Sequence, residues 1–92
     1  MLKLTLYYSS SFKKDMKKLK DKPKEKEQIA EVIKMLQHQI PLPAKHRDHS
    51  LLGSYKGYRE CHVLPDLLLI YKIEQENLIL ALTRVGSHSQ LF

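Results

Sequence analysis

Three histidines in the second half of the chain, His49, His62 and His88, carry the side chain best suited to proton transfer at neutral pH. An unperturbed imidazole has a pKa of about 6.5, so it can both give and take a proton there. Two carboxylates, Glu60 and Asp66, lie close to His62 in the sequence. Histidines and carboxylates gathered in one place predict general acid–base catalysis.

A guanidinium at Arg84 would complete a group able to cleave RNA without a metal ion. RNA supplies its own nucleophile, the 2′-hydroxyl. The protein needs a carboxylate or neutral histidine as base, an arginine or lysine to stabilise the phosphate charge, and a protonated histidine as acid. Each acid or base contributes about 10²–10⁴ in rate. Spacing alone does not assemble this group, because an antiparallel hairpin can bring the end of the last strand near Asp66 or near His49.

Other kinds of site fit the sequence less well. His46 and His49 have the spacing of a metal-binding pair, but two loop histidines are a weak signal. Cys61 is the single cysteine, and its strand-like context predicts a core residue rather than a nucleophile. The three glycines form no phosphate-binding loop. We therefore predict no metal and no cofactor.

The elements that position these residues follow from the hydrophobic pattern. Apolar residues alternate near the start, then recur at helical spacing, and return to strand-like runs in the second half. We predict a strand over 2–7, helices over 12–20 and from Pro23 to before Pro41, a loop over 40–56, strands over 58–63, 67–73 and 78–85, and a C-terminal tail over 86–92.

These elements predict one α+β domain over residues 1–92, in the order β-α-α-β-β-β. A helical hairpin would pack on one face of a mostly antiparallel, four-stranded sheet. In the strand over 58–63, Glu60 and His62 share one face with Tyr58, while Cys61 shares the apolar face with Arg59. We therefore expect Glu60 and His62 to face solvent or a cleft. An arginine suits that face only near the end of the strand.

The net charge of +6 is unevenly placed. Residues 1–47 hold 12 lysines and arginines against 5 acids, and residues 48–92 hold 4 against 5. Such a basic half permits a nucleic-acid partner without proving one. Lys45 and Arg47 are candidates for phosphate contacts, and Phe92 or Tyr58 for stacking on a base.

No apolar run reaches the ~18 residues that a membrane span needs. The N-terminus alternates apolar and polar residues and lacks the apolar region of a signal peptide. A single cysteine suits a reducing compartment. We therefore predict a cytoplasmic protein with no membrane partner.

Three segments resemble one known family. They are DHSLLG at residues 48–53, GYRECHVLPDLLLIY at residues 57–71 and RVGSHSQLF at residues 84–92. Together they resemble the YafQ-like toxins of the RelE/ParE superfamily of bacterial toxin–antitoxin systems. The resemblance spans essentially the whole chain, and the predicted order of elements matches that fold.

The resemblance implies an endoribonuclease that cleaves mRNA, often on the ribosome, and is neutralised by a small antitoxin protein. It also implies that operator DNA is bound only through the antitoxin. Carried over by position, the catalytic residues are His49, His62, Asp66, Arg84 and His88, with Glu60 in support and Phe92 on the RNA. The loop residues Lys45 and Arg47 are further candidates for contacts with RNA phosphates.

The implied roles leave alternatives open. His88 is the first candidate for general acid or base, with Asp66 or His62 as its complement. Arg84 would stabilise the phosphate, and Glu60 would orient a histidine. Some family members have tryptophan after the aspartate where this chain has Leu67. That difference removes one possible stacking contact.

Two rival functions differ in class from an endoribonuclease. ParE-like members share the fold and inhibit DNA gyrase by binding, which requires no acid–base residues. A non-catalytic RNA-binding module would need only the basic residues. The three histidines favour the nuclease over both.

Overall fold

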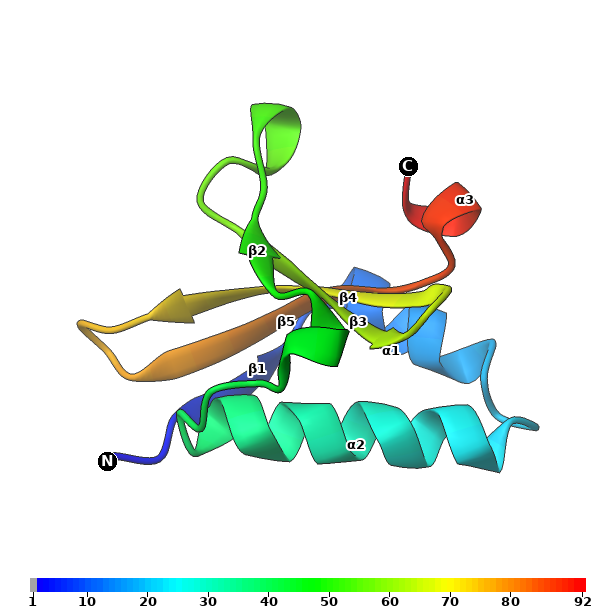
Figure 1. Cartoon of the computed structure of the whole chain (residues 1–92), viewed down its shortest axis with the longest axis horizontal. Helices are drawn as coiled ribbons and strands as arrows, with labels where there is room; N and C mark the ends of the chain where they lie inside the picture. The colour runs from blue at the N-terminus through cyan, green and yellow to red at the C-terminus, as the bar shows by residue number, and fades with distance from the viewer. Residues whose placement is uncertain (1) are drawn as a thin grey trace.

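The computed structural model describes residues 2–92, so Met1, which the predicted domain includes, lies outside the described residues. The elements follow the predicted α+β order, with one strand, two helices and then a run of strands, and a short helix follows at the end (Figure 1). Their bounds are β1 Thr5–Tyr8, α1 Ser10–Lys17, α2 Pro23–Gln37, β2 His49–Ser50, β3 Arg59–Leu64, β4 Leu67–Glu74, β5 Ile79–Gly86 and α3 His88–Leu91, with short 3₁₀ turns at Ala44–His46 and Gly53–Tyr55.

The strands form one sheet in the order β1-β5-β4-β3-β2. β1 pairs with β5 in parallel, and the other pairs are antiparallel. The prediction of four strands was one short, because β2 lies within the segment predicted as a loop. A strand of two residues carries no periodicity to recognise.

Local signals explain where the two longer helices begin. The side chain of Ser9 caps α1 by accepting a hydrogen bond from the backbone N–H of Phe12 at 2.9 Å. α2 begins with Pro23, whose fixed φ and missing N–H suit the first helical turn. Buried residues of both helices then pack on one face of the sheet, and α2 runs beneath it in Figure 1.

The main core lies between the helices and this face of the sheet. Cys61, Leu69 and Val85 contribute to it from three adjacent strands, with Phe12 and Ile29 from the helices. Cys61 is fully buried, as predicted. None of the helices within residues 2–92 is long and apolar enough to cross a membrane.

The opposite face carries a smaller apolar cluster. Leu68 and Ile70 of β4 pack there against Leu91, Tyr55 and Tyr58. The segment with β2 and the helix α3 rise from this face in Figure 1. The predicted C-terminal tail is therefore a short helix with an apolar anchor, Leu91.

Candidate active site

Strand register places four of the predicted site residues in two neighbouring rows on the face opposite α2. One row runs from Arg84 through Ile70 and Glu60 to His49, each paired directly with the next. The parallel row runs from Gly86 through Leu68 to His62. Directly paired residues share a face, and adjacent strands lie about 4.8 Å apart. Residues distant in sequence thus meet on one surface.

Glu60 is the centre of the first group. Its carboxylate is buried, although the sequence predicted a solvent-facing or cleft-facing residue. Glu60 Oε1 lies 3.5 Å from Nε2 of His49 and 3.9 Å from Nε2 of His62. The imidazole rings of the two histidines are 6.5 Å apart between centroids. One carboxylate therefore faces two histidines.

Backbone carbonyls set the ring orientations of both histidines. Nδ1 of His49 lies 2.6 Å from the carbonyl oxygen of Arg47, and Nδ1 of His62 lies 3.3 Å from that of Pro65. A carbonyl cannot donate, so Nδ1 carries the hydrogen in each ring. Each Nε2 therefore faces Glu60 as a lone pair, or as an N–H when the ring is protonated. The arrangement can hold or release a proton at Nε2.

His88 and Phe92 form a second group at the end of β5. Ser87 caps α3 together with Gln90, and His88 is the first residue of the helix. The His88 and Phe92 rings lie 5.2 Å apart between centroids, and Phe92 also contacts Tyr55 at 5.9 Å. Phe92 remains half-exposed, with its ring free to meet a partner.

Asp66 forms a hydrogen bond with the backbone of this second group. Its Oδ1 accepts a hydrogen bond from the backbone N–H of His88 at 3.2 Å. The contact fixes the start of α3 against the β3–β4 turn. Asp66 is therefore beside His88, but its recorded hydrogen bond is to the main chain rather than the imidazole.

Arg84 is held by a residue that the sequence analysis did not single out, Asp15 of α1. Arg84 Nε and Nη2 donate to the Asp15 carboxylate at 2.8 and 3.1 Å, and the backbone N–H of Val85 donates to it at 3.0 Å. This hydrogen bonding raises the pKa of Arg84 above its usual value. The Arg84 side chain is still 27% exposed, so the fixed cation remains accessible.

The predicted RNA contacts Lys45 and Arg47 are exposed in the segment before β2. His46 between them is buried, and its Nδ1 lies 2.6 Å from the carbonyl oxygen of His62. Arg47 adopts the left-handed conformation, with φ of 44°. The two cations are thus carried by a segment that is tied to β3.

A second tie holds the same segment, through Asp48. Its carboxylate accepts hydrogen bonds from the buried hydroxyl of Tyr71 and from Arg59, whose Nη2 lies 3.1 Å from Oδ2. Arg59 is the first residue of β3, which resolves the awkward position noted from the sequence. The two side chains fix the residue immediately before His49.

Changing Tyr71 to phenylalanine should therefore lower the free energy of unfolding by about 1.5 kcal/mol, because a hydrogen bond to a charged group is lost. In a double-mutant cycle, Tyr71→Phe and Asp48→Ala should show a coupling energy of at least about 0.5 kcal/mol. Urea unfolding measures both quantities. The imidazole ¹⁵N resonances of His49 should shift in Tyr71→Phe while those of His88 stay in place. If the stability losses of the two variants were additive and the His49 resonances did not shift, the hydrogen bond between Tyr71 and Asp48 would not position His49.

Burial also sets the ionisation of Cys61 and Tyr71. It raises the pKa of the Cys61 thiol to about 12, and burial together with the Asp48 hydrogen bond raises the pKa of Tyr71. The ordinary values are 9.0 and 10.0. Above about pH 9 the folded chain therefore holds protons that the unfolded chain loses.

The contribution of Cys61 and Tyr71 to the free energy of unfolding should be constant below about pH 9. It should fall as the pH rises toward 12. We expect a loss of at least about 1 kcal/mol between about pH 8 and pH 10.5 in urea unfolding. Cys61→Ala removes the thiol's share, so its stability should fall less steeply with pH. Equal slopes for the two proteins would refute the assignment.

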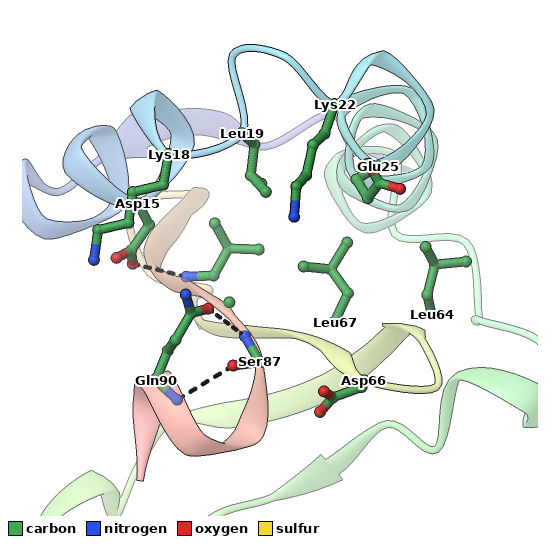
Figure 2. Close-up of a pocket in the computed structure, with 12 residues that line it drawn as sticks. Asp15, Lys18, Leu19, Lys22, Glu25, Leu64, Asp66, Leu67, Ser87 and Gln90 are labelled. Carbon is green, nitrogen blue, oxygen red and sulfur yellow. Dashed lines mark hydrogen bonds between the residues drawn. The ribbon is translucent and has the colours of Figure 1, made fainter.

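A cavity of about 470 Å³ opens on the helix side of the His88 segment. Figure 2 shows Lys22 reaching into it from the start of α2, with Asp66 and Ser87 on the opposite wall. Glu25 and Lys18 also line it, so its charges are of both signs. Mixed charge does not favour a polyanion.

Within residues 2–92, no three histidine, cysteine, aspartate or glutamate side chains are arranged to hold a metal ion.

Two features of the structure were not predicted, although the sequence contains a recognisable pattern for each. Asp15 lies three residues after Phe12 and one before Met16, on the apolar face of its helix, where an acid needs a partner. Ser87 and Gln90 have the spacing of a capping box, which predicts a helix start.

Known bacterial toxins are similar to this chain over nearly its whole length. Residues 4–92 match the family described as bacterial toxin of type II toxin-antitoxin system, YafQ. The mRNA interferase toxin YafQ of Escherichia coli K12 is 38% identical over 93 residues, covering 100% of this chain and 99% of the relative.

Two solved structures are similar over nearly their whole length. A metal-bound toxin from Helicobacter pylori has 43% identity and a TM-score of 0.88, covering 97% of this chain and 99% of that one. The E. coli DinJ–YafQ toxin–antitoxin complex contains a chain with 37% identity and a TM-score of 0.85, covering 99% of each. With the family matched over all but the first three residues, this chain belongs to the YafQ family of bacterial type II toxin–antitoxin toxins.

Proposed function

We propose that this toxin is an mRNA interferase, an endoribonuclease that inhibits translation by cleaving mRNA through metal-independent acid–base catalysis. The observation that carries the proposal is the pair of rows on one sheet face, where Glu60 faces His49 and His62 and where Arg84 stands in line with them. The E. coli relative named an mRNA interferase supports the same activity.

The reaction needs no atom beyond RNA and these side chains. A base removes the proton of the 2′-hydroxyl, and the 2′-oxygen attacks the adjacent phosphorus. The bond from phosphorus to the 5′-oxygen breaks, and an acid protonates that oxygen. The products are a 2′,3′-cyclic phosphate and a 5′-hydroxyl. Arg84 stabilises the extra charge on the phosphate during the attack.

The contacts favour His62 over Asp66 as the partner of His88 in acid–base catalysis. His62 presents Nε2 toward the site, whereas Asp66 is engaged by the backbone N–H of His88. His49 hydrogen-bonds or protonates the phosphate, and Glu60 orients both neighbouring histidines. Phe92, half-exposed beside His88, stacks on a base.

The proposed partners follow from the same surface and from the family. An antitoxin protein would neutralise the toxin, as the E. coli complex with DinJ suggests for this chain. Lys45 and Arg47 would contact mRNA, and the basic residues of the helices would contact the ribosome. Operator DNA would be bound only through the antitoxin, and the toxin would act in the cytoplasm.

The test is to incubate purified protein with mRNA, with and without 70S ribosomes and with and without EDTA. The proposal predicts discrete cuts that leave 2′,3′-cyclic phosphate ends and persist in EDTA. Intact mRNA together with inhibited DNA gyrase would favour a ParE-like toxin. Salt-sensitive RNA binding without cleavage, unaffected by replacing the three histidines, would favour a non-catalytic RNA-binding module.

A further inference from the structure

A separate cavity of about 380 Å³ lies beside His62, at the outer edge of β3. β2 pairs only with Arg59 and Glu60, so the last part of this edge is not covered by a strand. The segment before β2, α2 and the β3–β4 turn enclose the cavity there. A volume of this size lies within the range of small-molecule binding pockets.

The lining of this cavity combines cations with an apolar surface. Lys45 and Arg47 line one side, and Leu64 and Pro65 contribute apolar surface. Gln28 of α2 also lines it, and none of the lining residues is a carboxylate. This contrasts with the mixed charges of the cavity in Figure 2. The lining suits a ligand that is anionic at one end and flat and apolar at the other.

We propose that this cavity is a nucleotide subsite, which takes one nucleotide of the mRNA strand next to the bond that is cut. The inference rests on the proposed function, because His62 belongs to both the cavity and the catalytic group. The base packs on Leu64 and Pro65, and Gln28 offers its amide to the base edge. Lys45 and Arg47 contact the flanking phosphates, and the bound nucleotide sets the register of the strand over His62.

The segment that carries the cations is held in place before RNA arrives. His46 is tied to the carbonyl oxygen of His62, and Asp48 is tied to Arg59 and Tyr71. Arg47 lies between His46 and Asp48 in the sequence, and Lys45 directly precedes His46. The subsite is therefore partly preorganised, which reduces the entropy lost on binding.

Filling the cavity is the direct test. Gln28→Trp should raise the Kd for a short single-stranded 2′-fluoro RNA, which lacks the nucleophile, by about tenfold, as expected for one lost base contact. Ala30→Trp places the same side chain at an exposed position of α2 and should leave the Kd unchanged. Thermal unfolding of both variants checks that they are folded.

Charge removal gives a second readout. Lys45→Gln with Arg47→Gln should reduce the slope of log K against log salt by about 1.4, the value for two phosphate contacts on a single strand. Lys24→Gln with Lys26→Gln, on exposed α2 positions, removes the same charge and should change the slope much less.

Each opposing result has a distinct meaning. Equal Kd values for Gln28→Trp and Ala30→Trp, or equal slopes for the two charge pairs, would overturn the subsite. If Gln28→Trp weakened the binding of the purified antitoxin but not of the RNA, the cavity would be a binding site for that protein. This result would also overturn the nucleotide subsite. Wild-type protein that binds the 2′-fluoro RNA but leaves the matching unmodified RNA intact, both with and without 70S ribosomes, would overturn the proposed function and retain the subsite.

Discussion

Replacing His88 with alanine is expected to slow RNA cleavage by about 10²–10⁴-fold, the contribution of one general acid or base. The side chain is replaceable without loss of the fold, because the anchors of α3 are the Ser87 cap, Gln90 and the buried Leu91. We therefore expect the free energy of unfolding to change by less than about 1 kcal/mol. Single-turnover cleavage and urea unfolding measure the two effects separately.

His38→Ala is the matched control, because His38 is an exposed histidine at the end of α2. It should cleave RNA at the wild-type rate. If His62 is the partner of His88 in the same step, the His62→Ala and His88→Ala losses should combine to much less than their product. A fully active His88→Ala protein would remove this residue from the mechanism, and strictly multiplicative losses would separate the two histidines into different steps.

The longer strands were predictable because their residues alternate or form an apolar run between clear turns. β3 and β4 are joined at Pro65 and Asp66, and both lie within one residue of their predicted bounds. The assignment of Glu60 and His62 to one face and Cys61 to the other is confirmed by the register. Period-two patterning carries this information locally, so no tertiary contact is needed to predict it.

The spacing of residues in the sequence does not predict which of them lie together in a row on the sheet. Arg84 and Glu60 are brought to the same row by pairing through Ile70, and a register shift next to Ile70 determines which face Arg84 occupies. A shift of one residue would turn the Arg84 side chain to the other face. Nothing in the local sequence marks that irregularity, so the sequence left open whether His88 and Arg84 lie near Asp66 or near His49.

The uneven distribution of positive charge along the chain corresponds to two different surfaces of the fold. Most of the positive charge is on α1, α2 and their connection, on the face opposite the proposed catalytic groups. Lys45 and Arg47 are the exception, since they lie at the edge of β3 beside His62. The two surfaces can therefore have separate partners: the helices a large polyanion, and the edge of β3 the RNA strand that is cut.

Replacing Asp15 with alanine is expected to lower the free energy of unfolding by about 3 kcal/mol, the lower end for breaking a buried ion pair. The variant leaves the backbone N–H of Val85 without its acceptor and leaves Arg84 without its carboxylate. The buried N–H of Val85 then lacks compensation for the water that it lost on folding, and the partly exposed Arg84 loses its charged partner. For a domain of this size, the midpoint of thermal unfolding should fall by roughly 12 °C or more.

Asp21→Ala controls for the change in net charge, because Asp21 is an exposed acid that follows α1. Its stability should stay within about 0.5 kcal/mol of the wild type. Asp15→Asn keeps one acceptor oxygen for the N–H of Val85 but loses the charge, so it should fall between the two. Urea unfolding with an unchanged m-value measures all three. If Asp15→Ala were no less stable than Asp21→Ala, the carboxylate would not hold Arg84 in place, and this cation would have to be fixed by other contacts.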